Sequence, residues 1–223
     1  MPRLSLELQL EKSGIRCYEF LEKFDRQQGS VTLPRPIEDL NNAAMQNLLF
    51  GIVDKNKQKE LVAVGGLFPV DTHGKIWELG QCCVHPKYRG RRLQSALVIS
   101  RTIISQVFLY NPIFVTAIKS TNYASLNNCQ AAGFKPLDNM IPELLEPCKD
   151  CNCRVNLFSC CCDFYQLKLS PQDISTIANQ MLKGNNNCYF PGKLDQNVDI
   201  QLSCELSNAL NKWENKNEYQ KIA

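Results

Sequence analysis

An arginine-rich turn carries the clearest chemistry in this chain. The segment Tyr88–Arg92 reads Tyr-Arg-Gly-Arg-Arg and lies between a strand-like segment that ends at Val84 and a helical pattern that begins at Leu93. A helix N-terminus presents backbone N–H groups without intrahelical partners and a partial positive charge, to which the three arginines add. The turn is therefore suited to bind a phosphorylated ligand, above all a pyrophosphate.

Hydrophobic spacing predicts the elements that position these arginines. Residues 76–84 alternate as a strand does, with every second side chain on one face. From Leu93 to Val107, apolar residues recur with the period of a helix. The arginines thus stand where a strand turns directly into a helix.

This turn resembles the signature of the GNAT superfamily of acyl-CoA-dependent N-acyltransferases. The signature reads V-x-P-x-Y-R-G, then a glycine-rich turn and a helix, and the residues matching it in register are Val84, Pro86, Tyr88, Arg89, Gly90, Ser95, Ala96 and Leu97. A second element, from Asn122 to Phe134, is similar to the family's next helix and its Gly-Phe ending. The resemblance is firm over about residues 60–136.

The resemblance implies an α/β fold with a mixed central sheet flanked by helices. It also implies transfer of an acetyl group from acetyl-CoA to a primary amine by direct attack. Acetyl-CoA would lie between splayed strands, here 76–84 and 113–118, with backbone N–H groups at Cys82 and Val84 facing the acyl oxygen. The acetyl-CoA site assigned in this way comprises Cys82, Val84, Arg89, Gly90, Arg91, Arg92, Gln94, Ser95, Asn122 and Ser125. For Asn122 and Ser125, capping of the helix is an equally good explanation.

The turn departs from the family pattern at two positions. Arg92 and Gln94 stand where glycines are usual. Glycine lets the backbone approach a phosphate closely, but we expect the helical conformation itself not to require it. Backbone N–H groups survive both replacements, and Arg92 could pair with a phosphate directly. The alternative is a degenerate site that no longer binds coenzyme A.

Glu78 is the candidate general base. Several family members carry a glutamate six residues before the position held here by Val84. On a regular strand Glu78 shares a face with Cys82, which suits removal of a proton through one water molecule. The alternative is a strand carboxylate without a catalytic part.

The general acid is assigned to Cys129, at the position where many family members carry a tyrosine. A thiol can donate a proton, although its pKa differs from that of a phenol. Tyr123, Tyr165 and solvent are the alternatives.

A cysteine cluster forms a second candidate site. The chain has twelve cysteines, and six of them fall within 148–162: Cys148, Cys151, Cys153, Cys160, Cys161 and Cys162. In a reducing compartment such clustering favours a metal over disulfides, and the spacing of Cys148 and Cys151 is that of a zinc knuckle. A structural zinc held by four of these thiolates is the prediction. The alternatives are a redox-active thiol cluster and thiols packed as small apolar residues.

Composition limits the class of protein. Of the 223 residues, 44% are hydrophobic and 21% charged, and the net charge is +3. These values predict an ordinary globular protein, with neither a nucleic acid nor a membrane as its partner. The N-terminal residues lack the apolar run of a signal peptide, so we expect a cytoplasmic protein.

The chain is predicted to form an acyltransferase-like domain over residues 1–169, with a cysteine-rich insertion at about 139–162. A helical extension over 170–223 follows; Leu202, Leu206, Leu210 and Trp213 recur in it at helical spacing. Its last helix packs on the domain or forms a contact in an oligomer. The predicted strands are 4–9, 48–54, 61–68, 76–84, 113–118, 134–137 and 163–169, with helices after Ser13 and over 37–47 and 172–183.

Two function classes remain open. The first is an N-acetyltransferase acting on acetyl-CoA and the amine of a small molecule or a protein. The second is a non-catalytic acyl-CoA-fold module whose zinc or thiol cluster serves metal sensing or protein contact.

Overall fold

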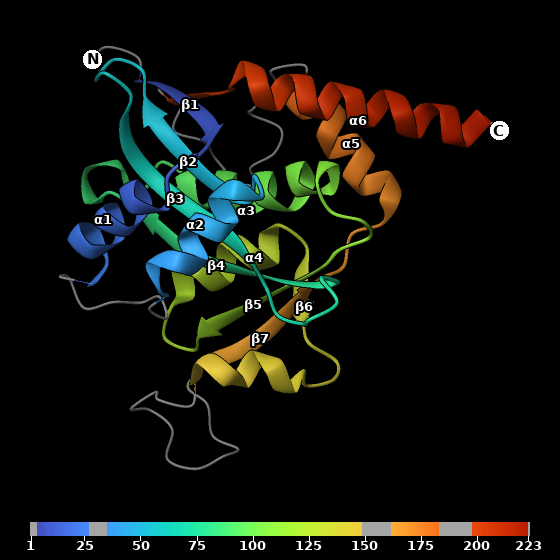
Figure 1. Ribbon diagram of the computed structural model, residues 1–223, viewed down its shortest axis with the longest axis horizontal. Helices are drawn as coiled ribbons and strands as arrows, with labels where there is room; N and C mark the ends of the chain where they lie inside the picture. The colour runs from blue at the N-terminus through green and yellow to red at the C-terminus, as the bar shows by residue number, and fades with distance from the viewer. Residues whose placement is uncertain (1–3, 27–34, 149–161, 183–197, 223) are drawn as a thin grey trace.

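An eight-stranded mixed sheet runs through the computed structural model, which describes residues 4–26, 35–148, 162–182 and 198–222. The strand order is β6-β7-β5-β4-β3-β2-β1-β8 (Figure 1). The strands are β1 (Leu4–Leu10), β2 (Leu49–Asp54), β3 (Glu60–Pro69), β4 (Ile76–Val84), β5 (Ile113–Lys119), β6 (Phe134–Pro136), β7 (Cys162–Leu167) and β8 (Val198–Leu202). The predicted fold class is confirmed.

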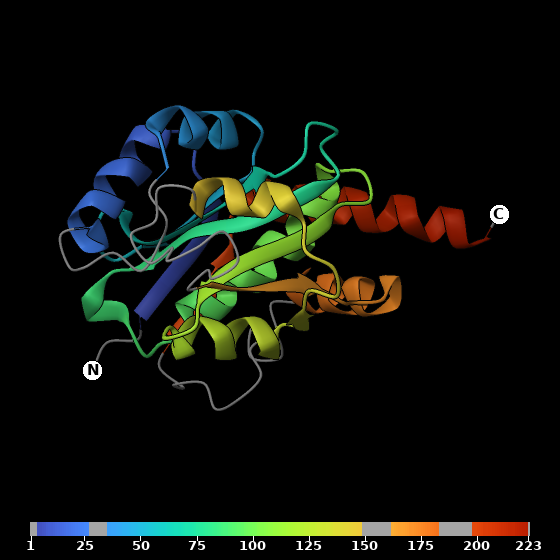
Figure 2. The same cartoon turned by 90° about the horizontal axis from the view of Figure 1, so that it is seen from below.

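Helices cover both faces of this sheet. They are α1 (Gly14–Phe24), α2 (Ile37–Met45), α3 (Leu93–Ile104), α4 (Tyr123–Ala131), α5 (Pro171–Leu182) and α6 (Cys204–Ile222), with 3-10 turns η2 (Pro86–Tyr88), η3 (Ser105–Val107) and η4 (Pro142–Cys148). Figure 2 shows α1, α2 and η4 on one side of the sheet and α4 and α5 on the other. None of the described helices is long and apolar enough to cross a membrane.

Helix α3 is the most enclosed helix. Its residues from Ala96 to Ile104 are all buried, because β3 and β4 cover one side of the helix and α4 and α5 pack against it as well. The apolar spacing predicts one buried side of this helix. In the structure polar residues of α3 outside that pattern, such as Arg101, are buried as well.

The first helix begins where its sequence signals predict. The Ser13 side chain accepts a hydrogen bond from the Arg16 N–H at 3.4 Å, which satisfies one of the free donors of the first turn. Cys17, Phe20 and Leu21 then face the core. The predicted helix after Ser13 is confirmed.

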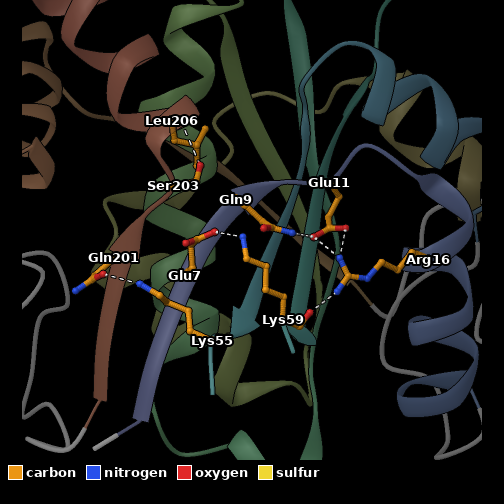
Figure 3. A network of polar contacts seen from close by, with 9 residues as sticks. All are labelled: Glu7, Gln9, Glu11, Arg16, Lys55, Lys59, Gln201, Ser203 and Leu206. Atoms are coloured by element: carbon orange, nitrogen blue, oxygen red, sulfur yellow. Dashed lines mark hydrogen bonds and ion pairs between the residues drawn. The ribbon is translucent and has the colours of Figure 1, made fainter. Parts of the chain in front are cut away.

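The C-terminal segment adds a strand as well as helices. Strand β8 pairs in parallel with β1, with Leu202 at its end, so the prediction that Leu202 belongs to the last helix is wrong. Figure 3 shows polar contacts across this edge, including Lys55 Nζ donating to Gln201 Oε1 at 3.2 Å. The five alternating residues of β8 are too few to stand out from the helical pattern that follows. Leu206 and Leu210 are fully buried on α6.

Candidate active site

Strands β4 and β5 separate after a short paired stretch. Their parallel register covers only Ile76–Glu78 against Ile113–Val115, and β5 goes on to pair with β7. The Thr116 hydroxyl still donates to Leu79 O across the gap, at 3.1 Å. The splay expected between these strands is present, and it holds a cavity of about 70 Å³.

A bulge interrupts β4 next to this splay. The register between β3 and β4 shifts between Val64 and Gly66, and Gln81 adopts a left-handed φ of 52°. As a result, Cys82 packs with the α3 cluster, whereas Glu78 pairs with Arg35 just before α2. The expectation that Glu78 and Cys82 share a strand face is therefore wrong, because the extra residue breaks the alternation.

The arginine-rich turn is anchored at its first two residues. The buried Tyr88 hydroxyl donates to Asp54 Oδ2 at 2.6 Å, and burial together with this hydrogen bond raises the pKa of Tyr88. Arg89 Nε donates to Val84 O at 3.3 Å. These contacts tie the turn to the ends of β2 and β4, so its backbone geometry is preset.

Arg92 has an unusual backbone conformation. It is the N-cap of α3, with φ of 59° and ψ of 21°, in the left-handed region. That conformation costs a residue other than glycine about 1–2 kcal/mol. Arg92 thus stands at a non-helical position that favours glycine, whereas Gln94 lies within the regular helix, whose conformation does not require glycine.

A cavity of about 500 Å³ opens beside the turn. Of the residues predicted to bind acetyl-CoA, those that line it are Cys82, Val84, Arg89, Gly90, Arg92, Gln94 and Asn122. Cys82, Gln94 and Asn122 also line the smaller cavity in the splay, together with Ser125 and Glu78. The two cavities therefore adjoin, and they connect the arginine turn with the splay.

A chain of amide contacts links α3 to α4 at the junction of the cavities. Ser95 Oγ donates to Asn128 Oδ1 at 2.6 Å, and Asn128 Nδ2 donates to Gln94 Oε1 at 3.0 Å. Asn122 accepts from the Ser125 N–H at 3.2 Å and so caps α4. Asn128 lines the larger cavity but belongs to no motif, which is why the sequence pattern did not single it out.

The family model of GNAT acetyltransferases matches residues 16–134, more than half of the chain. The chain belongs to this family. None of the curated proteins matches the acetyltransferase chain closely enough to count as a relative.

Solved structures share the fold of this GNAT chain. N-acetylglutamate synthase from Neisseria gonorrhoeae, with coenzyme A and N-acetyl-glutamate, is 13% identical with a TM-score of 0.54, over 74% of this chain and 35% of that one. An N-acetyltransferase from Thermoplasma acidophilum in complex with coenzyme A is 13% identical (TM-score 0.50; 74% and 100% covered). A ribosomal-protein-alanine N-acetyltransferase from Brucella melitensis is 14% identical (TM-score 0.50; 73% and 99% covered).

Glu78 of this acetyltransferase is buried and forms an ion pair with Arg35. The Arg35 guanidinium also lies 4.2 Å from the centre of the Phe68 ring and 3.5 Å from Asp39 Oδ2. Glu78 and Arg35 both line the cavity in the splay. Arg35 was not a candidate, since no spacing in the sequence connects it with a residue forty-three positions away.

Cys129 lies on α4 as a buried thiol and lines neither of the two cavities. Burial raises the pKa of Cys129 to about 12, which the nearby Arg101 only partly offsets. The same cause raises the pKa of Cys82. Both thiols therefore keep their protons at neutral pH.

The predicted metal ligands fall largely outside the described residues. Cys151, Cys153, Cys160 and Cys161 lie there, while Cys148 ends η4 and Cys162 begins β7 as a buried residue. Within the part of the chain that the structure describes, no three His, Cys, Asp or Glu side chains are grouped to hold a metal. The cysteine-rich insertion and its zinc stay predictions.

Proposed function

We propose that this chain is an N-acetyltransferase that transfers the acetyl group of acetyl-CoA to a primary amine by direct attack. The observation that carries the proposal is the splay between β4 and β5, whose cavity adjoins the larger one beside the arginine turn. A ligand with a pyrophosphate at one end and a thioester at the other matches these two chemically different ends. N-acetyltransferases with the same fold bind coenzyme A in the solved structures described above.

The pyrophosphate is assigned to the turn. Arg89 and Arg92 would supply charge, and Gly90 and the first N–H groups of α3 would supply backbone donors. Arg91 does not line the cavity and would act only through its charge. Because the turn is anchored through Tyr88, binding needs little reorganisation.

The pantetheine arm is assigned to the junction of the two cavities. Gln94 and Asn122 line both cavities there, and Ser125 lines the inner one. Ser95 binds Asn128 and would hold Gln94 in place through it. The arm would thus run between α3 and α4 into the splay.

Backbone N–H groups at Cys82 and Val84 are assigned to the acyl oxygen. Such donors stabilise the negative charge that develops on this oxygen as the amine attacks. The bulge at Gln81 supports the assignment, since it turns the β4 backbone away from a regular ladder beside the splay.

Glu78 is assigned as the base that removes the proton of the attacking amine. Its carboxylate lines the inner cavity and is held by Arg35. Cys129 is a poor proton donor to the leaving thiolate. Its pKa of about 12 makes it a weaker acid than the coenzyme A thiol that would be formed, so the proton transfer is unfavourable. Solvent entering the open outer cavity is the better source of that proton.

Release of free coenzyme A from acetyl-CoA, measured with a thiol reagent across a panel of small amines and peptides, tests this function. We expect amine-dependent release by the wild type. Binding of acetyl-CoA without release for any amine would instead favour the non-catalytic module.

We also propose that the chain works in the cytoplasm and that Cys148 and Cys151, with two of the four remaining clustered cysteines, hold one structural zinc. Among the described residues, the thiols of Cys17, Cys82, Cys83, Cys129 and Cys204 form no disulfide, which supports a reducing compartment. Elemental analysis of protein purified without chelator should give one zinc per chain, and Cys148→Ser with Cys151→Ser should abolish it. Protein without metal would contradict the zinc proposal.

A further inference from the structure

Arg101 carries a charge in the middle of the molecule. It lies on α3 and is only 1% exposed. No carboxylate of the described residues forms an ion pair with it, and the titratable groups that act on it are the thiols of Cys82 and Cys129. A buried charge without an opposite charge is destabilising, so packing alone does not explain this arginine.

The guanidinium is bonded entirely to backbone carbonyls. Nε donates to Leu97 O within the helix at 3.0 Å. Nη1 donates to two strand carbonyls at once, Gly66 O at 2.9 Å and Gly80 O at 3.0 Å. The side chain therefore joins α3 to β3 and β4 at one point.

That point is the bulge. Gly66 and Gly80 form the regular pair directly before the register shift, and Gly65 is the residue opposite the extra residue of β4. A Cβ on Gly65 would lie 3.0 Å from Arg101 Cζ, so the guanidinium occupies the space that a side chain would take. Bulges leave backbone groups without ladder partners, and Arg101 supplies the donors.

We propose that Arg101 is a positioning residue for the acyl oxygen: it pins the β3–β4 bulge so that the β4 backbone donors face the thioester carbonyl. The proposal rests on the proposed function. Its charge also faces Cys82, which lines both cavities, so the field of the guanidinium reaches the place where negative charge would develop. A purely structural arginine would affect stability and coenzyme A affinity rather than polarisation of the carbonyl.

The test uses acetyl-CoA labelled with ¹³C at the carbonyl, whose stretching frequency falls when hydrogen bonds polarise the carbonyl. We expect a shift to lower frequency on binding to the wild type. Arg101→Met, which fills the same volume with apolar atoms, should lose most of this shift and lower kcat about 10²-fold. The product coenzyme A lacks the thioester carbonyl, so its Kd should change less than about threefold.

Two further variants keep the test decisive if Arg101→Met does not fold. Gly65→Ala pushes the guanidinium by a few tenths of an ångström without removing its charge, and it should reduce both the shift and kcat several-fold. Thr102→Val is the matched control, because Thr102 is buried beside Arg101 but its hydroxyl bonds only within α3. It should leave the carbonyl frequency unchanged.

The outcomes separate the two proposals. Failure of the wild type to bind acetyl-CoA would overturn the proposed function and the role of Arg101 together. Tight binding with an unshifted carbonyl in the wild type, or a full shift in both Arg101→Met and Gly65→Ala, would overturn the role of Arg101 alone.

Discussion

The two ends of the candidate site are formed by different kinds of interaction. The outer cavity is formed by a turn, a helix N-terminus and the neutral contacts of Gln94, Ser95 and Asn128. At the inner end, the ion pair of Glu78 and Arg35 joins segments far apart in the sequence. The outer end thus relies on backbone groups and on residues of a turn and two helices, and the inner end on charged side chains that only the tertiary structure brings together. Coenzyme A recognition is accordingly easier to infer than the acceptor.

The inner end gives the largest expected effect. Glu78→Gln should lower turnover by about 10²–10⁴-fold at neutral pH and leave the Kd of coenzyme A nearly unchanged, because only proton removal is lost. Steady-state kinetics and calorimetry measure the two quantities. Glu60→Gln, an exposed carboxylate at the start of β3, is the control and should be neutral.

Arg35→Gln decides what Glu78 does. If the carboxylate acts as a base, losing its ion-pair partner should reduce turnover far less than Glu78→Gln does. An equal loss of turnover in the two variants would mean that Glu78 contributes through its ion pair with Arg35 and not as a base.

Charge reversal at the outer end should have the next largest effect. Arg89→Glu with Arg92→Glu places two carboxylates against the pyrophosphate, and we expect the Kd of coenzyme A to rise about 10²-fold or more. Lys75→Glu with Lys212→Glu makes the same change in net charge at exposed sites, and Lys75 stands just before the opposite end of β4 from the turn. An unchanged Kd in the arginine variant would mean that coenzyme A does not bind at this turn.

The left-handed backbone of Arg92 predicts a smaller effect. Arg92→Gly and Arg92→Ala both remove the guanidinium, so both should weaken coenzyme A binding about tenfold. Only alanine retains the unfavourable conformation, so the glycine variant should be the more stable by about 1 kcal/mol in urea unfolding. Equal stability would contradict the left-handed assignment.

Cys129 gives the smallest effect. Cys129→Ala should keep turnover within about threefold of the wild type at neutral pH, because a thiol with a pKa near 12 is a poor proton donor. A loss of 10²-fold with coenzyme A binding intact would restore Cys129 as the general acid.

Stability should fall in alkaline solution because burial raises the pKa values of two thiols. The buried thiols of Cys83 and Cys129 have pKa values raised to about 12, whereas an unfolded thiol ionises near pH 8.5. Above that pH the unfolded chain binds fewer protons than the folded one, so the free energy of unfolding decreases as pH rises. Urea unfolding from pH 7 to 10 should show this decrease, and Cys129→Ala should lessen it.

Local signals predicted most of the fold. Strand β4 spans Ile76–Val84 as the alternation predicts, and Ser13 caps α1, because these features depend on neighbouring residues. Most residues that the family motif singled out at the turn line one cavity. Strand β8 was missed because its place depends on pairing with β1, far away in the sequence.

Long-range geometry explains the other misses at the site. The bulge at Gln81 lies between β3 and β4 beside a hydrogen bond from Arg101, and neither partner is visible in the spacing of β4. The conformation of Arg92 is set by the path from β4 into α3, while its side chain gives no sign of it. Motifs therefore indicated the candidate site, and tertiary contacts determine how its residues are arranged.

Calorimetric titration of the wild-type chain with acetyl-CoA tests the central claim most directly. A single site per chain with a Kd below a millimolar, weakened about 10²-fold or more by Arg89→Glu with Arg92→Glu, is the predicted result. No heat of binding up to millimolar acetyl-CoA, from protein shown to be folded, would contradict it.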